Sequence, residues 1–420
     1  MAATSALDAF QLARRQLTLD RHRMRTFPWL AGRKRKLMQA SPLGFLRGSA
    51  RLFYEILQDN PSFGEGPGGR GWISGDLHLE NFGAYRHDNL LDSRMPKVVF
   101  NLNDFDEAVV GPWRFDILRF LTSFLVAAQG LAPPEARRVS ASEEIIESYV
   151  ATAMQSAAVP RPPEAVRELI EKVRNRTRKQ LLDARTRLVG GKRRLIRGKR
   201  YRSLGKELAA KARQAFAEYA KGLPERAAIP GALEILDVAF RIAGTGSLGL
   251  LRVAVLVKGK GGPNGAWLFD MKEEERSPAP SLLVGTPRIE PAERVVRAFR
   301  ACLEVPPQRM GTTRLDGRSM FVRRLTPQED KVSIRGMGFD ELGGLASFFA
   351  ALSGAAHRRG SKDRPPPWSR TAREQLLGSA LSLAGIYQAT YAVFCHLCAT
   401  RHAGAHAASA RMPGGHSSAR

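Results

Sequence analysis

The spacing of apolar side chains divides the chain into helical and extended stretches. In six segments the apolar residues recur at the spacing of a buried helix face. These predicted helical segments are residues 5–60, 114–157, 206–222, 290–302, 340–357 and 370–399. Within the first, Ser41 followed by Pro42 marks a helix start, because serine caps helices and proline suits their first turn.

Extended segments are predicted where apolar residues alternate or β-branched residues follow one another. They comprise short strands within 72–108, including the run 97–102, and residues 235–242, 250–257, 266–271 and 320–325. Residues 186–196 predict a hairpin that turns at Gly190-Gly191. Loops are predicted for the glycine-rich stretch 61–71, the turn-rich stretch 87–96, the proline-rich link at 365–367 and a disordered tail over 403–420. Together these elements predict a helix-rich α+β protein.

Composition narrows the class of protein. A chain of 420 residues, 43% hydrophobic and 25% charged, has room for two or three domains with a full core. The three cysteines, Cys302, Cys395 and Cys398, exclude a disulfide scaffold and favour a reducing compartment. No run of about eighteen apolar residues predicts a membrane span, and the N-terminus lacks the apolar core of a secretory signal. We therefore expect a cytoplasmic protein.

Positive charge is concentrated in one segment. The net charge is +26, and Lys172–Arg213 contains 17 Lys or Arg against two acids, Asp183 and Glu207. Such a segment attracts anions, so we expect it either to bind an anionic partner such as nucleic acid or to form a solvated face. Tyr201 is its one aromatic residue, which argues against base stacking.

Two polar loops carry candidate chemistry. In the first, the carboxylate of Asp76 could accept a proton from a hydroxyl, and the amide oxygen of Asn81 could bind a hard cation such as Mg²⁺. In the second, directly after the apolar run 97–102, Asp104 and Asp106 place together carboxylates that repel one another unless a divalent ion is bound. A solvated acidic turn is the alternative.

A glycine-rich turn lies between two predicted strands. It fits G-x-G-x-x-G, a weak signal alone, but a strand rather than a helix follows it, as in the phosphate-covering loop of kinases. The candidate phosphate-binding residues are Gly244, Thr245, Gly246, Ser247 and Gly249. On the third strand Lys272 could reach the phosphates, with Glu293 of the next helix holding it by an ion pair. A surface lysine and a surface glutamate are the alternative for this last pair.

A proton acceptor, metal ligands, a phosphate loop and a lysine form a complete set for phosphoryl transfer. Kinases present the glycine loop and lysine first, whereas here they come last, and a circular permutation accounts for that order. The predicted fold is protein-kinase-like and two-lobed, with permuted lobe order. Residues 1–232 form the helical catalytic lobe with a basic insertion near 172–213, residues 233–330 the β-rich nucleotide lobe, and residues 331–400 the helices that complete the first lobe.

Over about residues 20–400 the chain resembles the bacterial family called domain of unknown function 2252. The stretches that carry the resemblance are Ser41–Gly48, Gly75–Gly83, Asn103–Ala108, Gly111–Arg119, Gly244–Gly249, Leu268–Glu273 and Phe321–Leu325. The family is grouped with protein-kinase-like folds and its substrate is not established, so the resemblance implies a fold and leaves the acceptor open.

The first polar loop is also similar to the catalytic loop of aminoglycoside and choline phosphotransferases. That similarity implies that Asp76 is the catalytic base and that Asn81 and Asp104 are metal ligands. It further implies that Asp116 braces the loop. Ser74 stands where those enzymes commonly carry histidine, and the C-terminal helix lacks a polar run that we associate with the family.

The predicted activity is transfer of a phosphoryl group from Mg-ATP to an unidentified hydroxyl acceptor, small or macromolecular. Adenylyl transfer on the same fold is one alternative, and an inactive kinase-like scaffold or nucleic-acid-binding protein that uses the basic segment is another. Near the C-terminus a separate cluster carries zinc-type ligands, but its spacing leaves no room for the usual loop between ligand pairs. Its members are Cys395, Cys398, His402 and His406.

Overall fold

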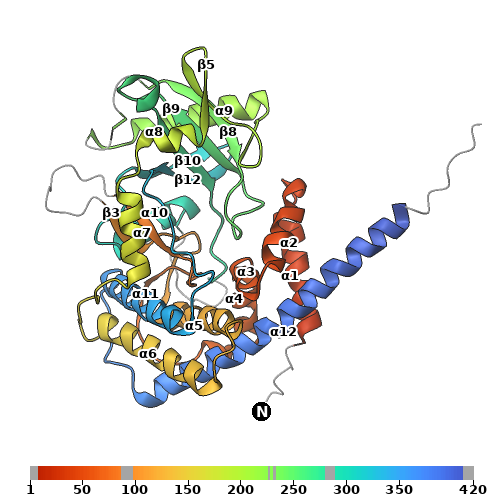
Figure 1. The fold of residues 1–420 in the computed structure, drawn as a ribbon, viewed down its shortest axis with the longest axis vertical. Helices are drawn as coiled ribbons and strands as arrows, with labels where there is room; N and C mark the ends of the chain where they lie inside the picture. The colour runs from red at the N-terminus through yellow and green to blue at the C-terminus, as the bar shows by residue number, and fades with distance from the viewer. Residues whose placement is uncertain (1–7, 87–97, 226–227, 230–232, 280–288, 410–420) are drawn as a thin grey trace, which may run out of the picture.

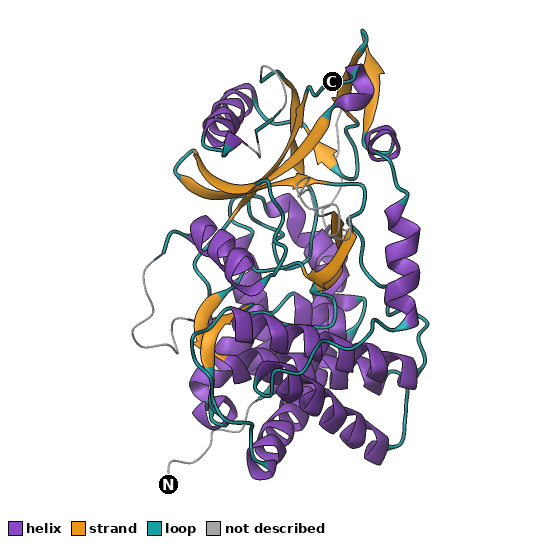
Figure 2. Ribbon diagram, turned by 90° about the vertical axis from the view of Figure 1, so that its left-hand side faces the viewer, coloured by secondary structure: helices purple, strands orange, loops and turns teal. Residues whose placement is uncertain are grey.

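The computed structural model describes residues 8–86, 98–225, 228–229, 233–279 and 289–409, with the backbone alone for 401–409. A helical body and a body built on a β-sheet are stacked along the long axis of the molecule (Figure 1). Figure 2 shows the same division by secondary structure, with most helices in the lower part and the large curved sheet in the upper part.

Short helices begin the described chain: α1 (Ala9–Arg23), α2 (Ala31–Gln39), α3 (Pro42–Arg47) and α4 (Ala50–Asp59). Side-chain caps set two of their starts. Asp8 accepts a hydrogen bond from Phe10 N at 2.8 Å, and Ser41 accepts one from Gly44 N at 3.0 Å. The helix start predicted at Ser41-Pro42 is confirmed, with the proline in the first turn of α3.

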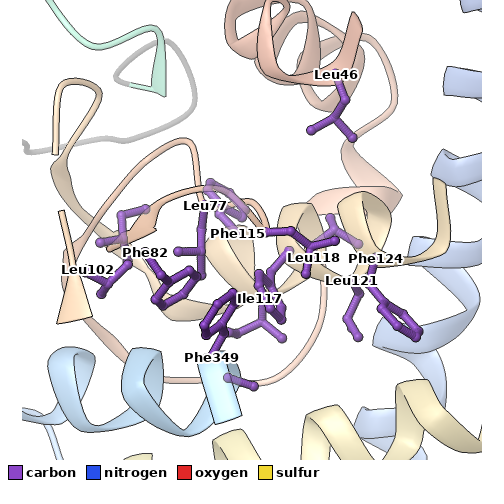
Figure 3. Packing of buried hydrophobic residues seen from close by; sticks show 14 of the residues in the cluster. Leu46, Leu77, Phe82, Leu102, Phe115, Ile117, Leu118, Leu121, Phe124 and Phe349 are labelled. Carbon is purple, nitrogen blue, oxygen red and sulfur yellow. The ribbon is translucent and has the colours of Figure 1, made fainter. Parts of the chain in front are cut away.

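The helical body is organised around α5 (Trp113–Gln129), in which 14 of 17 residues are buried. Three helices pack around it: α6 (Glu135–Ala153), α11 (Phe339–Arg359) and α12 (Arg370–Ser409). Figure 3 shows Ile117, Leu118 and Leu121 of α5 in this core, with Phe82 and Phe349 beside them. The rings of Phe82 and Phe349 stack with centroids 4.1 Å apart, so that α11 is joined to the strand that follows the first polar loop.

The upper body is a six-stranded antiparallel sheet in the order β11-β12-β10-β9-β8-β7. Its strands are β7 (Tyr201–Arg202), β8 (Ile235–Arg241), β9 (Arg252–Val257), β10 (Trp267–Glu273), β11 (Met310–Leu315) and β12 (Arg318–Leu325). Strands β8, β9 and β10 form a meander. Helix α10 (Pro291–Cys302) then leads into the β11–β12 hairpin, whose second strand pairs with β10. The four strands and the helix predicted in this region are confirmed.

Both faces of this sheet are covered, which explains why its central strand β9 is apolar from Val253 to Val257 rather than alternating. On one face α9 (Lys206–Lys221) packs Phe216 against Phe269, with ring centroids 4.9 Å apart. On the other face Leu182 and Leu195 cluster with Leu268. Neighbouring residues of β10 therefore enter two different cores, as the two-residue period of a strand requires.

Smaller elements surround the two bodies in the described part of the chain. Two-stranded antiparallel ribbons pair β1 (Arg70–Ile73) with β4 (Val109–Pro112), β2 (Phe82–Arg86) with β3 (Val98–Leu102), and β5 (Thr186–Val189) with β6 (Lys192–Leu195). The last ribbon is the predicted hairpin, and Gly190 and Gly191 have φ of +56° and +72° at its turn. Two further helices are α7 (Glu164–Arg174) and α8 (Arg178–Asp183), and 3₁₀ turns occur at η1 (Pro28–Leu30), η2 (Pro61–Gly64) and η4 (Gly262–Gly265).

Two predictions about helix limits are wrong. The helix predicted over 114–157 is two helices, because Pro133 and Pro134 interrupt it before α6. The tail predicted to be disordered from 403 continues as α12 to Ser409, since its alanines favour helix. The rest of that tail, 410–420, and the predicted turn-rich stretch 87–96 lie outside the described residues.

One described helix meets a length-and-composition test for membrane spans, which the sequence prediction did not anticipate. Arg370–Thr400 of α12 has an 18-residue window of mean hydropathy 1.2, of which 28% is buried. The test alone is weak evidence, because core helices of globular proteins meet it as well. The buried side of α12 includes Phe394 and Tyr387, whose ring centroids lie 5.0 and 6.2 Å from that of Phe45.

Candidate functional site

A buried carboxylate holds the loop between β1 and β2 in place. Asp116, in the first turn of α5, accepts hydrogen bonds from Ser74 N at 2.7 Å and Gly75 N at 2.9 Å. Its Oδ2 also lies 3.1 Å from His357 Nε2. Gly75 has φ of +80°, and a Cβ there would lie 2.0 Å from the carbonyl oxygen of Glu107, so this position requires glycine. Asp116 thus has the bracing geometry that the resemblance implied.

Asp76, the predicted proton acceptor, lies beside a buried arginine. Arg119 Nε donates to Asp76 Oδ1. The same guanidinium donates to Leu46 O at 2.8 Å and to Tyr387 Oη at 3.3 Å. Burial raises the pKa of Asp76 to about 7, although the positive charge of Arg119 opposes the rise. The sequence analysis assigned no role to Arg119, whose one signal is a charged residue within the mostly apolar stretch 115–126.

Asn81 connects the first polar loop to the second. Its Oδ1 accepts a hydrogen bond from His78 N at 2.6 Å, and its carbonyl oxygen accepts one from Asn103 N at 2.8 Å. An amide oxygen has two lone pairs, so Oδ1 keeps one for a further donor or a cation. In the second loop, Asp104 Oδ1 lies 3.4 Å from Asp106 N. The buried amide oxygen of Asn103 has no hydrogen-bond partner among the described residues.

The glycine-rich turn joins β8 to β9, as predicted from the flanking strands. Gly244 has φ of +82° and Gly249 has φ of +103°, a region that side-chain-bearing residues rarely adopt. A Cβ on Gly249 would also lie 2.6 Å from the carbonyl oxygen of Arg23. Gly249 therefore packs the turn against the end of α1, whereas Gly244 and Gly246 line the cavity described below.

The predicted ion pair between Lys272 and Glu293 is wrong. Lys272 Nζ pairs with the carboxylate of Asp106 and lies 3.3 Å from Glu274 Oε1. Glu293 lies on the exposed side of α10, where it accepts a hydrogen bond from Arg297 Nε at 2.9 Å. Burial raises the pKa of Glu274 to about 7, although Lys272 opposes the rise. One of these two partners, Glu274, follows the lysine by two residues, and side chains at i and i+2 of an extended chain point to the same face.

Most of the predicted residues line one cavity of about 370 Å³ between loops of the helical body and the sheet. They are Asp76, Asn81, Asp104, Asp106, Gly244, Thr245, Gly246, Ser247 and Lys272. Gly249 and Glu293 are not among its lining residues. Cationic and acidic side chains are equally numerous around it: Arg23, Arg47, Arg241, Arg252, Lys272, Arg323 and Lys331 against Asp76, Asp104, Asp106, Glu107, Asp270, Glu274 and Glu275. The cavity can therefore bind phosphate groups and a cation together.

One protein-family model matches most of the chain, including the loops and strands that form this cavity. The model of a family of uncharacterized proteins conserved in bacteria, DUF2252, matches residues 25–411. The chain belongs to this family. No curated protein and no solved structure matches the chain. The geometry of the cavity is therefore what indicates a function for this DUF2252 protein.

The acidic side of the cavity of this DUF2252 protein suits a hard divalent cation. Carboxylate oxygens of Asp104 and Asp106 and the amide oxygen of Asn81 are the ligand types that Mg²⁺ prefers. No group of three or more His, Cys, Asp or Glu side chains is set to hold a metal among the described residues. Mg²⁺ in phosphoryl-transfer sites is usually held by one or two carboxylates plus substrate phosphates, so these residues fit a metal that arrives with a nucleotide.

The sheet side of the cavity contains a second buried carboxylate that the sequence analysis missed. Asp270 of β10 accepts hydrogen bonds from Arg252 Nε at 2.9 and 3.0 Å and lies 2.5 Å from Arg241 Nη1. Burial raises the pKa of Asp270, but Arg241 and Arg252 outweigh burial and hold that pKa well below its usual range. Arg241 Nε is buried without a hydrogen-bond partner among the described residues, so an anion in the cavity would complete its hydrogen bonding.

The basic segment of the DUF2252 chain, Lys172–Arg213, is partly neutralised at short range. In the described part of the chain seven of its cations pair with acidic side chains: Arg174, Arg176, Lys179, Lys192, Arg193, Arg197 and Lys211. Arg193 is 3% exposed and lies 2.8 Å from Asp183. Arg193 and Arg197 therefore fasten the β5–β6 ribbon and the residues after it to α8 and β8, whereas most of the segment's other cations are exposed.

The cysteine and histidine cluster of the DUF2252 protein lies on α12. All three cysteines are free thiols, and Cys398 is buried while Cys395 is partly exposed. His402 and His406 fall where the structure describes the backbone alone. The described side chains of this cluster therefore add no ligand group to the site.

Proposed function

We propose that this DUF2252 protein is a kinase-like phosphotransferase that uses Mg-ATP to phosphorylate a hydroxyl acceptor. The observation that carries the proposal is the single cavity that joins Asp76, the Asp104 loop, the glycine turn and Lys272. These groups come from segments about 200 residues apart in sequence, and they match the parts that phosphoryl transfer requires.

The order of elements in the sheet supports a protein-kinase-like nucleotide lobe. A glycine turn joins β8 to β9, the first two strands of the meander, the lysine lies on its third strand, β10, and a helix, α10, follows. The catalytic and metal loops precede this lobe in the chain instead of following it. We therefore propose a circularly permuted, two-lobed kinase-like fold.

The protonation of Asp76 supports its role as the general base. A base works best with a pKa near the working pH, and burial raises the pKa of Asp76 to about 7. Arg119 fixes the carboxylate through Oδ1, whereas Oδ2 accepts no hydrogen bond among the described residues, with His78 Nε2 4.0 Å away, and would accept the proton of the acceptor hydroxyl. Asp104 and Asn81 would hold Mg²⁺, which would neutralise charge on the phosphates.

The nucleotide phosphates would lie under the glycine turn, near Lys272 and the unpartnered Arg241 Nε. A neighbouring cavity of about 420 Å³ extends the site along the end of β12 and shares Arg241, Arg323 and Phe299 with the first. This second space would take the base and ribose. Part of its wall is α8, so the basic segment contributes to the nucleotide site through its fold as well as its charge.

The test is thermal unfolding with ATP, with and without Mg²⁺. A ligand at a hundredfold excess over its dissociation constant stabilises the folded state by about 2.7 kcal/mol. We expect a Mg-dependent rise in the melting temperature that Asp104→Ala abolishes. Asp340→Ala is the matched control, because Asp340 is exposed at the start of α11.

Incubation of the wild type with Mg-ATP and candidate acceptors then reports the reaction. The mass added to the acceptor distinguishes phosphoryl from adenylyl transfer. No thermal shift in the wild type at millimolar ATP would contradict the proposal and favour a scaffold or nucleic-acid-binding role.

A further inference from the structure

We infer that a separate cavity enclosed by the N-terminal helices is the acceptor site, and that it takes a neutral polyhydroxy compound of the sugar or polyol class. The inference rests on the proposed function, because it places the acceptor hydroxyl at Asp76. The cavity has a volume of about 490 Å³ and is lined by side chains of α1, α2 and α4 together with Asp76. That size is within the range of about 300–1,000 Å³ typical of small-molecule sites.

Asp76 is shared by the two cavities. It lines the nucleotide cavity on one side and the N-terminal cavity on the other, as do Glu107 and Gly246. A hydroxyl bound in the N-terminal cavity and a phosphate bound under the glycine turn would therefore meet at this carboxylate. A cavity of this volume, lined by helices of one chain, suits a small molecule better than a macromolecule, which requires a broad surface.

Three buried polar side chains in the N-terminal cavity leave two acceptor atoms without donors. Gln16 is 2% exposed, Lys34 3% and Asp20 8%. Gln16 Nε2 donates a hydrogen bond to Asp20 Oδ1 at 2.9 Å, and Lys34 Nζ lies 2.6 Å from the same oxygen. Because a carboxylate only accepts hydrogen bonds, the amide nitrogen of Gln16 must face Asp20. Gln16 Oε1 and Asp20 Oδ2 then have no donor among the described residues.

Buried polar atoms are rarely left unpaired, so these two oxygens indicate a ligand that donates hydrogen bonds. Hydroxyl groups and ammonium groups both donate. The charge of Asp20 is already balanced by Lys34 at 2.6 Å, which leaves no excess negative charge for an ammonium group. Hydroxyl donors are therefore the better match.

The charges around the N-terminal cavity also balance. Five cationic side chains line it, Arg23, Lys34, Arg47, Arg51 and Arg276, and so do five acidic ones, Asp20, Glu55, Asp76, Glu107 and Glu275. Several pair directly, including Arg51 with Glu55 at 3.3 Å and Arg23 with Glu275 at 3.4 Å. Because these side chains pair with one another, the lining has no surplus charge to select an anionic or a cationic acceptor, in spite of the net charge of +26 on the whole chain.

The reaction balances with these groups alone and Mg-ATP. The acceptor hydroxyl gives its proton to Asp76 Oδ2 as its oxygen forms a bond to the γ-phosphorus. The bond from that phosphorus to the oxygen bridging the β- and γ-phosphates breaks, and ADP leaves with the electron pair. Asp76 then releases the proton to solvent.

The experiment measures binding of glucose, maltose, myo-inositol and glycerol to the full chain by calorimetry, first without nucleotide. We expect at least one of these neutral probes to bind and to be phosphorylated by Mg-ATP. Gln16→Leu should weaken its binding by about tenfold or more, the effect of losing a buried hydrogen bond. Gln11→Leu is the matched control, since Gln11 lies exposed on the same helix and the same substitution there should change nothing.

A Mg-ATP thermal shift retained in Gln16→Leu shows that the variant is folded and separates the acceptor site from the nucleotide site. Mg-ATP binding with no response to any neutral probe would overturn the acceptor class and leave the proposed function standing. Tighter binding of phosphorylated sugars than of the neutral probes would have the same meaning. If a probe binds and Gln16→Leu does not weaken that binding, the assigned site is wrong. If a probe binds but ATP does not, the acceptor site is supported and the proposed function is overturned.

Discussion

Asp76 and Asp270 face the cavity under the glycine turn from opposite sides, and their pKa values are shifted in opposite directions. Asp76, on the helical side, has one guanidinium partner, and burial raises its pKa to about 7. Asp270, on the sheet side, lies against both Arg241 and Arg252, which hold its pKa well below its usual range. Burial raises the pKa of both groups, so the neighbouring charges decide the outcome: Glu107 and Asp104 add to the rise at Asp76, whereas two arginines reverse it at Asp270.

The opposite pKa shifts of Asp76 and Asp270 suit the two carboxylates to different roles. A carboxylate with a pKa near neutrality can exchange a proton during turnover. A carboxylate held by two arginines stays ionised, and its role is to fix the side chains of those arginines where they line the cavity. One side of the site is therefore suited to reaction and the other to binding charge.

The largest effect is expected from Asp76→Asn, which keeps the size of the side chain and removes the base. Turnover should fall by about 100- to 10,000-fold, while the dissociation constant of Mg-ATP stays unchanged, because general-base catalysis contributes an amount of this order. Steady-state kinetics and calorimetry on the same preparation measure the two quantities. Turnover equal to that of the wild type would remove Asp76 from the mechanism.

Asp270→Asn should lower the stability of the fold rather than remove a reacting group. It leaves Arg241 and Arg252 buried without a counter-ion, and breaking such a group costs about 3–5 kcal/mol of unfolding free energy. Urea unfolding measures the loss, with the exposed Asp340→Asn as control. If Asp270→Asn were as stable as the wild type but inactive, the division between a reacting side and a structural side would be wrong.

The next effect concerns the pH dependence of activity. Asp76 must be ionised to accept a proton, so kcat/KM should rise with pH through about 7. Arg119→Gln removes the charge that lowers the pKa of Asp76 and should move this rise to higher pH by about 1–3 pKa units. A pH profile of each protein tests this, and an unmoved profile in Arg119→Gln would show that another group titrates.

The smallest effect is expected on the pH dependence of stability, where Glu274 and Glu293 should differ. The pKa of Glu274 is raised from 4.5 to about 7 in the folded state, so the folded state holds this proton more tightly than the unfolded one. Stability from this group is present below pH 4.5 and is lost as the pH rises through about 7. Glu274→Gln should reduce the fall in unfolding free energy over this interval by up to about 1.4 kcal/mol per pH unit. Glu293→Gln should leave the curve unchanged.

The sequence predicted the reacting side of the site better than the binding side. Asp76, Asn81 and Asp104 fall in short local motifs, so their meeting in one cavity follows from two loops and the strands beside them. The arginines that hold Asp270 are separated along the chain, at 241 and 252, and only strand pairing brings them together. No local pattern marks such residues in a chain with 66 Lys and Arg.

The fold was predictable where periodicity was strong and uncertain at its limits. The β8–β10 meander and the β5–β6 hairpin were found because glycine turns lie between their strands, and α10 was found because its apolar residues recur at helical spacing. The pairing of Lys272 was mistaken because sequence order does not show which side of α10 faces the sheet, and Glu293 lies on the other side. The short β7 and β11 were missed, since they lack a continuous apolar run.

The brace on the Asp76 loop has a consequence for how the chain is made. Asp116 is contacted by His357, 241 residues later, and Arg119 by Tyr387, 268 residues later. A ribosome translating this chain releases both acidic loops long before it releases the helices that hold them. The nascent chain therefore cannot hold the Asp76 loop in this arrangement until α11 and α12 have both been synthesised.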